Sequence, residues 1–271
     1  MKNNVVVIQI DPTADLEEIW KNLEETGCNL LYSSSDDTSQ HIFCRLPSGI
    51  KKQRIMTQFP EILAIDTASL PEIDWETQWA DYAQGYRNGL LHVNIETKNK
   101  SSIQQLILQP GPGFGDLSHA TTRLVLKLMP SVVYNKNVLD VGCGSGILSL
   151  AAIAMNASSV CGIDIDDDAL IHSRINSQLN GMENVISFMK PEKYCKKSSD
   201  ALVLLMNMIQ SEQEVAWNSL KSIHKNVTTI LASGILAADC SIYKKLCDSW
   251  GWSIENEIEE DGWMAYHFLK K

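Results

Sequence analysis

Residues 138–146, VLDVGCGSG, constrain the fold of this chain more than any other stretch. The first of them have the pattern of a buried strand, and Gly142, Gly144 and Gly146 follow at alternate positions, which is typical of a turn against which a small ligand lies. Ile147 stands where a dinucleotide-binding fingerprint has its third glycine, so the spacing argues against NAD. The alternative interpretation is a plain turn beside a strand.

An acidic residue, Asp140, precedes the first glycine by two positions. A carboxylate at this place suits a cationic ligand better than a phosphate. The ammonium and sulfonium groups of S-adenosylmethionine meet that requirement. We therefore expect S-adenosylmethionine as the cofactor.

The residues after the glycines predict a βαβ unit, with a short buried helix at 147–155 and a strand at 160–165. Asp164 ends this strand roughly twenty residues past the glycines, where doubly wound sheets place an acid that binds both ribose hydroxyls. Its alternative role is a helix cap. The three aspartates at 166–168 directly precede the predicted helix at 169–180 and are better placed to cap it, which leaves Asp164 for the ligand.

The composition limits the classes of partner. The chain has 271 residues, enough for one large domain or two smaller ones, and a formal net charge of −10, which argues against a broad nucleic-acid surface and favours a basic protein. Its seven cysteines form no CxxC pair, so neither a disulfide framework nor a metal site is predicted. The N-terminus turns polar too soon for a signal peptide and no apolar run is long enough to cross a membrane, so we expect a soluble, cytoplasmic monomer.

Residues 1–68 are predicted to form a small α+β domain of the ferredoxin-like type. The patterns follow the order βαββαβ, with strands at 5–10, 29–33, 40–46 and 62–66 and helices at 15–26 and 49–59. Residues 69–102 are interpreted as a helical connector. Its aromatic residues are spaced for one face of a helix and are expected to pack rather than to stack on a ligand; they are Trp75, Trp79, Tyr82 and Tyr86.

Residues 103–271 are predicted to form a Rossmann-like α/β domain. Strands that alternate with helices require a mostly parallel sheet with both faces covered. Beyond the βαβ unit, strands are predicted at 185–188, 201–206, 228–232, 253–258 and 263–269, and helices at 212–223 and 238–250.

This second domain resembles the class I S-adenosylmethionine-dependent methyltransferases, and most closely the PrmA family, bacterial enzymes that methylate large-subunit ribosomal protein eleven. The resemblance is carried by PGPGFGDLSHATTRLVLKL, by VLDVGCGSG with GIDID, by LLMNMI, by SGIL and by the terminal GWMAYHFL. A small βαββαβ domain and a tryptophan-bearing connector ahead of it are also the family's arrangement. The resemblance therefore spans nearly the whole chain and implies that the first domain recognises the substrate.

The resemblance also implies roles for the matching residues. Thr122 would contact the cofactor from the segment before the glycines, while Gly142, with Gly144 in the same turn, would lie at its methionine end. Asp164 would bind its ribose. Asn207 would lie beside the transferring methyl group, as a cofactor contact and as the catalytic residue. A polar residue at the carboxyl end of a parallel strand points into the crevice where ligands bind, which agrees with this role for Asn207.

One loop departs from the family pattern FGTGxH, because residues 114–119 read FGDLSH. Leu117 replaces a glycine, and a leucine is strained if the turn requires a positive φ. Asp116 could compensate by attracting a sulfonium, or the loop could hold the cofactor differently, and the sequence leaves both open. His119 could equally be structural, and the Thr122 hydroxyl could cap the following helix instead of binding a ligand.

The predicted function is methyl transfer to amines, namely lysine side chains or the N-terminal amine, of a basic ribosomal protein. Such a transfer is a single displacement that needs no enzyme nucleophile, and positioning alone can supply roughly 7–11 kcal/mol. Residues 208–210, Met-Ile-Gln, lack the proline-rich and aromatic continuation that follows this asparagine in nucleobase methylases. The alternatives are a methyltransferase of another protein or of a small molecule, and a non-catalytic module that binds the cofactor.

Overall fold

The structure is a computed structural model, and it describes residues 5–35, 39–47, 49–67, 85–97, 103–195 and 201–271. The chain divides into two compact units, Met1–Ile73 and Asp74–Lys271. Each unit is described by itself.

The first unit is a four-stranded antiparallel sheet with two helices. Alternating side chains of β1 and β3, among them Ile8, Ile10 and Ile42, are fully buried against apolar residues of the helices such as Leu23 and Ile55. The strand order is β2-β3-β1-β4, which with the element order βαββαβ gives the ferredoxin-like arrangement that the sequence predicts. The elements are β1 Val5–Ile10, α1 Leu16–Glu25, β2 Asn29–Ser35, β3 Gln40–Arg45, α2 Lys52–Gln58 and β4 Ile62–Thr67.

The prediction of a helical connector is wrong where the structure describes it. Tyr86 lies in strand β5 (Tyr86–Arg87), and β6 (Leu90–Glu96) pairs with β5 and with β7 (Ile103–Leu108) in a three-stranded antiparallel sheet. Leu91, Val93 and Ile95 alternate with polar residues and are buried in the core of the second unit. Burial of every second residue is typical of a strand. Because these side chains are buried in the core of the second unit, that unit includes residues before the predicted boundary at residue 103. Trp75, Trp79 and Tyr82 lie outside the described residues.

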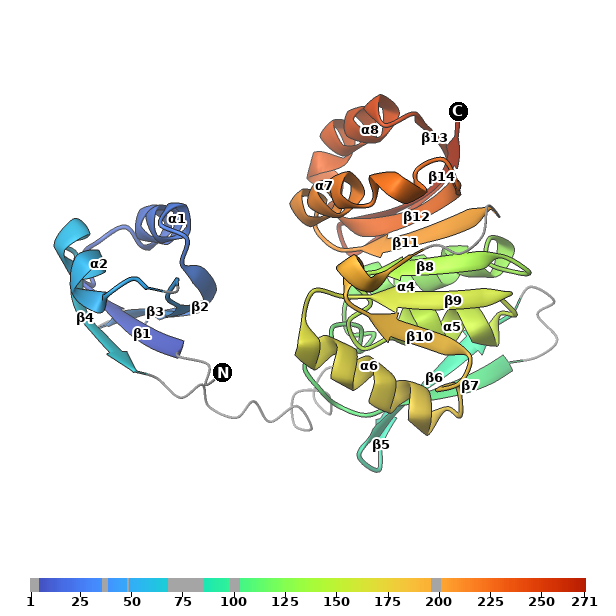
Figure 1. The fold of residues 1–271 in the computed structure, drawn as a ribbon, viewed down its shortest axis with the longest axis horizontal. Helices are drawn as coiled ribbons and strands as arrows, with labels where there is room; N and C mark the ends of the chain where they lie inside the picture. The colour runs from blue at the N-terminus through green and yellow to red at the C-terminus, as the bar shows by residue number, and fades with distance from the viewer. Residues whose placement is uncertain (1–4, 36–38, 48, 68–84, 98–102, 196–200) are drawn as a thin grey trace. The chain divides into compact units, whose positions relative to one another are not determined.

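The second unit is built around a seven-stranded sheet, whose strands are stacked one above another in Figure 1. Counted from β8, the parallel strands follow the Rossmann order 3-2-1-4-5, and β14 joins β12 in antiparallel fashion, with β13 at the edge. The order of the sheet is β10-β9-β8-β11-β12-β14-β13. The bounds are β8 Asn137–Val141, β9 Ser159–Ile163, β10 Ile186–Met189, β11 Leu202–Asn207, β12 Val227–Leu236, β13 Trp252–Glu260 and β14 Trp263–Lys270.

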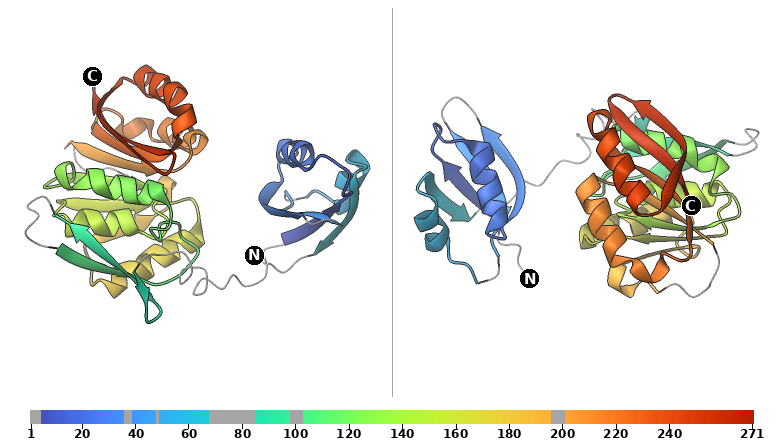
Figure 2. Two further views of the ribbon diagram at one scale, coloured as in Figure 1. Left: turned by 180° about the vertical axis from the view of Figure 1, so that it is seen from behind. Right: turned by 90° about the horizontal axis from the view of Figure 1, so that it is seen from above.

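Helices cover both faces of this sheet, as the sequence predicts. In β8, Val138 belongs to a core shared with α4, α5, α6, β6 and β7, whereas Leu139 and Val141 belong to a second core shared with α7 and α8. Figure 2, seen from behind, shows β6 and β7 on the side of α4 and α5. The helices are α4 Ala120–Leu128, α5 Ile147–Ala154, α6 Asp167–Leu179, α7 Gln210–Ser219 and α8 Cys240–Ser249, and short 3₁₀ turns lie at Met129–Ser131, Pro191–Lys193, Lys221–Ile223 and Ala237–Asp239.

Among the described residues, no helix combines the length and the apolar character that a membrane crossing requires.

Candidate functional site

The candidate site lies where β8 and β11 run side by side in the sheet (Figure 1). Met206 is paired with Val141 in this parallel ladder, so the next residues, Asn207 and Gly142, come together at the carboxyl edge. The strand order reverses between these two strands, and ligands of doubly wound sheets bind at such a switch point. The sequence predicted both residues as site residues, and the topology brings them together.

The backbone N–H groups of the glycine turn already have hydrogen-bond acceptors within the chain. Gly142, Gly144 and Gly146 have φ values of 69°, 54° and 83°, a region that L side chains rarely adopt. The N–H groups of residues 142–146 all donate within the chain, so a phosphate would find none of these five groups free, which agrees with the argument against a dinucleotide. Their acceptors, at 2.8–3.1 Å, are the carbonyl of Ile163 for residues 142 and 143, Asp164 Oδ2 for residue 144, the carbonyl of Phe114 for residue 145 and the carbonyl of Cys143 for residue 146.

Asp164 follows β9 directly and is half-buried. Its Oδ2 accepts from Gly144 N at 3.0 Å and its Oδ1 accepts from Asp166 N at 2.9 Å. The cap of α6 is Asp166, whose Oδ1 accepts from Asp168 N, so of the three predicted capping residues Asp166 has this role, while Asp167 and Asp168 lie in the first turn of the helix. Asp164 therefore braces the glycine turn, and because a carboxylate has about four lone-pair sites, it can still accept from hydroxyl groups of a ligand.

Asp140 does not face a ligand as the sequence suggested. Its side chain is fully buried, and Oδ2 accepts a hydrogen bond from Ser149 Oγ of α5 at 2.7 Å. Burial raises the pKa of Asp140 to about 7, against the opposing effect of the hydrogen bonds from Ser149. The acid belongs to the packing between β8 and α5.

A hydrogen bond joins two of the predicted site residues. Asn207 Nδ2 donates to Thr122 Oγ1 at 3.2 Å, across 85 residues of chain. Thr122 is fully buried and does not cap α4; His119 does, because its Nδ1 accepts from Thr121 N. The other end of the amide, Asn207 Oδ1, is buried and has no hydrogen-bond partner among the residues that the structure describes. Such an acceptor is costly unless a ligand donates to it, which makes it the strongest sign of function at this edge.

The FGDLSH loop takes the strained conformation that the sequence suggested. Leu117 has a φ of 67°, in the left-handed region that costs a non-glycine residue about 1–2 kcal/mol. Asp116 does not reach outward, because its Oδ1 accepts from both the N–H and the hydroxyl of Ser118. Arg123 of α4 holds the loop by donating to the carbonyls of Leu117 and Ser118 at 2.8 and 2.6 Å. The same guanidinium pairs with Glu260 at 2.6 Å, which ties the loop to the hairpin of β13 and β14.

Sequence reasoning missed a row of polar residues on α6. His172, Asn176 and Asn180 are spaced by four, so they share one helix face, and all three bond the backbone of residues 107–113. His172 Nδ1 accepts from Gly113 N at 3.0 Å while Nε2 lies 2.8 Å from the carbonyl of Gln109. Burial lowers the pKa of His172, which favours the neutral ring that these two bonds require. The spacing within the predicted helix was the signal that could have revealed this row.

Two other residues of the site were also missed. Ser145 is fully buried, and within the described part of the chain its Oγ has no hydrogen-bond partner. Met208 covers Gly142, since a Cβ built on that glycine would lie 2.5 Å from Met208 Cε. Met208 therefore stands over the end of the turn that faces Asn207.

Metal ligands and the cysteine of the turn were the remaining candidates at this site. No group of three or more His, Cys, Asp or Glu side chains among them could hold a metal ion. Burial raises the pKa of the Cys143 thiol well above its ordinary value, so this cysteine of the turn is protonated at neutral pH and is not a nucleophile.

The topology defines a Rossmann-like α/β domain, with the candidate site at the carboxyl ends of β8 and β11. The family model described as "Ribosomal protein L11 methyltransferase (PrmA)" matches residues 6–271. The chain therefore belongs to the ribosomal protein L11 methyltransferase (PrmA) family.

Individual relatives agree with this family. A ribosomal protein L11 methyltransferase of Pasteurella multocida is 32% identical over 69% of this chain and 64% of its own length, so the chain spans less than two thirds of that relative. The protein of the same name from Shewanella piezotolerans is 32% identical over 82% of this chain and 76% of its own length. A crystal structure titled ribosomal protein L11 methylase, from Lactobacillus delbrueckii subsp. bulgaricus, is 24% identical, covers 60% of this chain and 84% of that chain, and has a TM-score of 0.48.

Proposed function

We propose that the chain is an S-adenosylmethionine-dependent protein methyltransferase that transfers methyl groups to amines of ribosomal protein L11. Family membership supports the class of reaction and the substrate. The single observation that carries the proposal is the pair of Thr122 and Asn207, which leaves Asn207 Oδ1 buried without a partner at the switch point. An N–H of the acceptor amine, or the ammonium of the cofactor, would supply the missing donor.

The residues present fit the cofactor. Gly142 and Gly144 carry no side chains of their own at the turn, and Asp164 retains acceptor sites for two ribose hydroxyls. When bound, S-adenosylmethionine supplies an electrophilic methyl group on a sulfonium, whose C–S bond breaks with its electron pair left on sulfur as the N–C bond forms.

The chain's own part is to hold the acceptor. A lysine ammonium must lose its proton to water before it attacks, which at pH 7 costs roughly 4–5 kcal/mol from a reference pKa near 10.4. Asn207 is neutral, so it can accept from the amine without stabilising the ammonium as a carboxylate would. Thr122 orients the amide, since its Oγ1 binds Nδ2 and so turns Oδ1 toward the site. Alignment then supplies most of the rate enhancement.

The two units have different roles toward the substrate. We infer that the first unit binds the body of the basic substrate while the second methylates it. The net charge of −10 would speed the encounter with a lysine-rich protein, and the on-rate should then fall with rising ionic strength.

The test is transfer of tritiated methyl from S-adenosylmethionine to purified L11, compared between the natural chain, Asn207→Ala and Asn137→Ala. Asn137 begins β8 at the opposite edge of the sheet and binds Ser159 Oγ, so it serves as the matched control. We expect label on L11, a loss of at least about 100-fold in kcat for Asn207→Ala, consistent with one lost transition-state hydrogen bond, and little change for Asn137→Ala. If label appeared only on another protein, that protein would be the acceptor instead of L11. Binding of S-adenosylhomocysteine without methyl transfer to any substrate would indicate that the chain is a non-catalytic module that binds the cofactor.

A further inference from the structure

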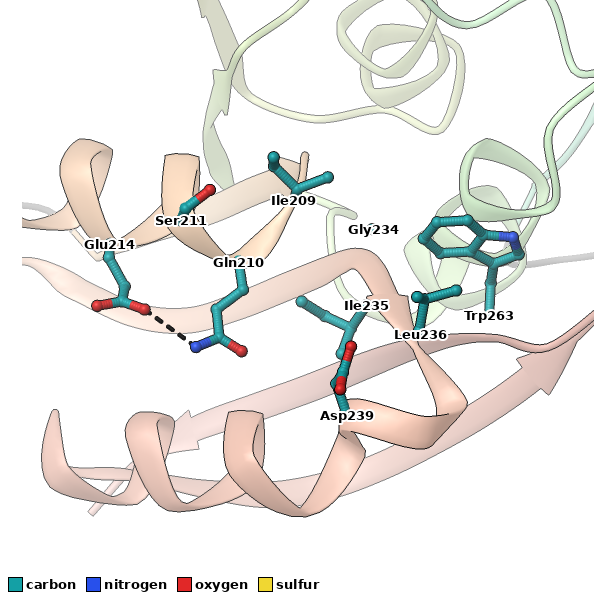
Figure 3. Close-up of a pocket in the computed structure, with 9 residues that line it drawn as sticks. All are labelled: Ile209, Gln210, Ser211, Glu214, Gly234, Ile235, Leu236, Asp239 and Trp263. Carbon is teal, nitrogen blue, oxygen red and sulfur yellow. Dashed lines mark hydrogen bonds between the residues drawn. The ribbon is translucent and has the colours of Figure 1, made fainter. Parts of the chain in front are cut away.

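A cavity of about 360 Å³ opens beside Asn207, at the carboxyl ends of β11 and β12. Its walls come from the start of α7, the end of β12, the 3₁₀ turn after it and the start of β14. Figure 3 shows the side chains arranged around this space. The lining residues are Ile209, Gln210, Ser211, Glu214, Gly234, Ile235, Leu236, Asp239 and Trp263.

The cavity and the candidate site both lie at the carboxyl end of β11. Asn207 is paired with Ser233 in the ladder of β11 and β12, and the next residue, Gly234, belongs to the lining. A Cβ built on Gly234 would lie 2.2 Å from the carbonyl oxygen of Met208, so the two strand ends pack directly on each other. Along β12 the partner of Asn207 is therefore one position before the lining, and along β11 Asn207 is two positions before Ile209 of the lining.

The lining combines apolar walls with negative charge. Its ionisable members are both acids: Glu214, which is half-buried, and Asp239, which is exposed. Gln210 Nε2 donates to Glu214 Oε1 at 3.0 Å, which occupies one oxygen of that carboxylate and fixes its position. In Figure 3 the amide of Gln210 lies between the two acids.

The aromatic wall is also fixed. Trp263 is packed edge to face against His119, with ring centroids 4.7 Å apart. Leu236, which also lines the cavity, is paired with Trp263 across the ladder of β12 and β14 and is 46% exposed. An indole face and aliphatic side chains favour a methylene chain, and an indole also attracts a cation.

Resting on the proposed function, we propose that this cavity binds the acceptor side chain as a charged primary ammonium on an aliphatic chain, and that Glu214 and Asp239 determine this specificity. The two acids attract the ammonium at the rim, where solvent is present, while Ile235, Leu236 and Trp263 contact the methylenes. The ammonium gives its proton to water when the nitrogen leaves the acids for the neutral Asn207, because a carboxylate stabilises the charged form and a neutral amide does so less. Glu214 and Asp239 are therefore specificity residues and not bases.

The test uses n-butylammonium, which reproduces the lysine side chain, and n-butanol, which has the same length without charge. Each is titrated into the full chain saturated with S-adenosylhomocysteine, and binding is followed by the NMR signal of the Trp263 indole N–H, assigned with Trp263→Phe. The variant is Glu214→Gln/Asp239→Asn. The control Glu183→Gln/Glu212→Gln removes two exposed acids outside the cavity and so keeps the net charge equal.

We expect the natural chain to prefer n-butylammonium at least tenfold, about 1.4 kcal/mol. The Glu214→Gln/Asp239→Asn variant should prefer n-butylammonium by at most about threefold, whereas the control should keep the full preference. Salt should weaken the preference of the natural chain, because the acids lie near solvent. An unchanged preference in the variant, or no saturable shift with n-butylammonium, overturns the inference even if L11 is methylated. The chain could also show a preference that depends on the two acids and yet transfer no methyl group. That result would overturn the proposed function but not the binding site.

Discussion

The glycine turn at 142–146 and the loop at 114–119 meet at the same edge of the sheet, yet they reach a left-handed backbone in opposite ways. The turn places Gly142, Gly144 and Gly146 at its three positive φ values. The loop has glycine at one positive position, Gly115, and leucine at the other, Leu117. The two segments touch, because the carbonyl of Phe114 accepts from Ser145 N.

The difference lies in what holds each segment. Backbone hydrogen bonds hold the turn, so it needs no side chain beyond the brace from Asp164. The loop depends on side chains: Asp116 binds Ser118, and Arg123 binds the carbonyls of Leu117 and Ser118. A segment with strain of about 1–2 kcal/mol persists only when its surroundings over-determine it. The turn therefore keeps its conformation through its backbone, whereas the loop keeps its conformation through these side chains.

The largest expected effect comes from adding one methyl to the turn. In Gly144→Ala the Cβ would lie 2.7 Å from the carbonyl oxygen of Phe114, so the turn and the loop must separate. We expect the affinity for S-adenosylhomocysteine, measured by calorimetry, to fall at least about 30-fold, about 2 kcal/mol. Gly181→Ala is the control, since it has a similar φ of 65° but open space around its Cβ. An equal loss of affinity in both variants would show that backbone strain alone, not the contact with the loop, is responsible.

The next effect tests the support of the loop from α6. In His172→Gln, Gly113 N loses its acceptor, and an unsatisfied buried donor costs about 1–3 kcal/mol. We expect about tenfold weaker binding of S-adenosylhomocysteine. His224→Gln is the control. It removes a histidine that binds the carbonyl of Trp217 and stacks on the Trp217 indole, and it should change the stability of the fold without changing the affinity for S-adenosylhomocysteine. Unchanged affinity in His172→Gln would mean that the loop keeps its place without this row.

A third effect concerns the buried acid ahead of the turn. Burial raises the folded-state pKa of Asp140 to about 7, above the unfolded value near 3.9, so the folded state keeps a proton that the unfolded state releases. The free energy of unfolding should therefore fall as the pH rises from about 4 to about 7 and then level off. Urea unfolding of Asp140→Asn should lack this slope. A wild-type stability that rises over this range relative to the variant would contradict the burial of Asp140.

The smallest effect comes from relieving the strain in the loop. Leu117→Gly removes a left-handed strain of about 1–2 kcal/mol but adds about 0.5–1 kcal/mol of unfolded-state entropy, so a net stabilisation of up to about 1.5 kcal/mol is expected. Denaturant midpoints measure it. Asn156→Gly, at a φ of 65°, should give less, because asparagine tolerates this region. A clearly destabilised Leu117→Gly would show that the side chain's packing against the core outweighs its strain.

Much of the architecture follows from local patterns. The alternation of strands and helices, the glycine turn and the capping of α6 by Asp166 were all predictable, because each depends on residues close in sequence. The strands β5 and β6 were missed although Leu91, Val93 and Ile95 have the period of a strand, because the aromatic spacing around them suggested a helix. The role of Asp140 was misjudged for another reason, since its partner Ser149 lies across a strand-to-helix packing interface.

By itself the sequence determined the class of domain, the place of the glycine turn and the residues Thr122, Gly142, Gly144, Asp164 and Asn207 as candidates. Only the tertiary structure decided that Thr122 binds Asn207 and leaves Oδ1 unpaired, that α6 holds the loop through His172, and that Glu214 and Asp239 share a cavity beside them. The physical reason is the range of the interactions. Periodicity and capping act within a few residues, whereas these contacts join strand ends and helices that the sheet order brings together across the chain.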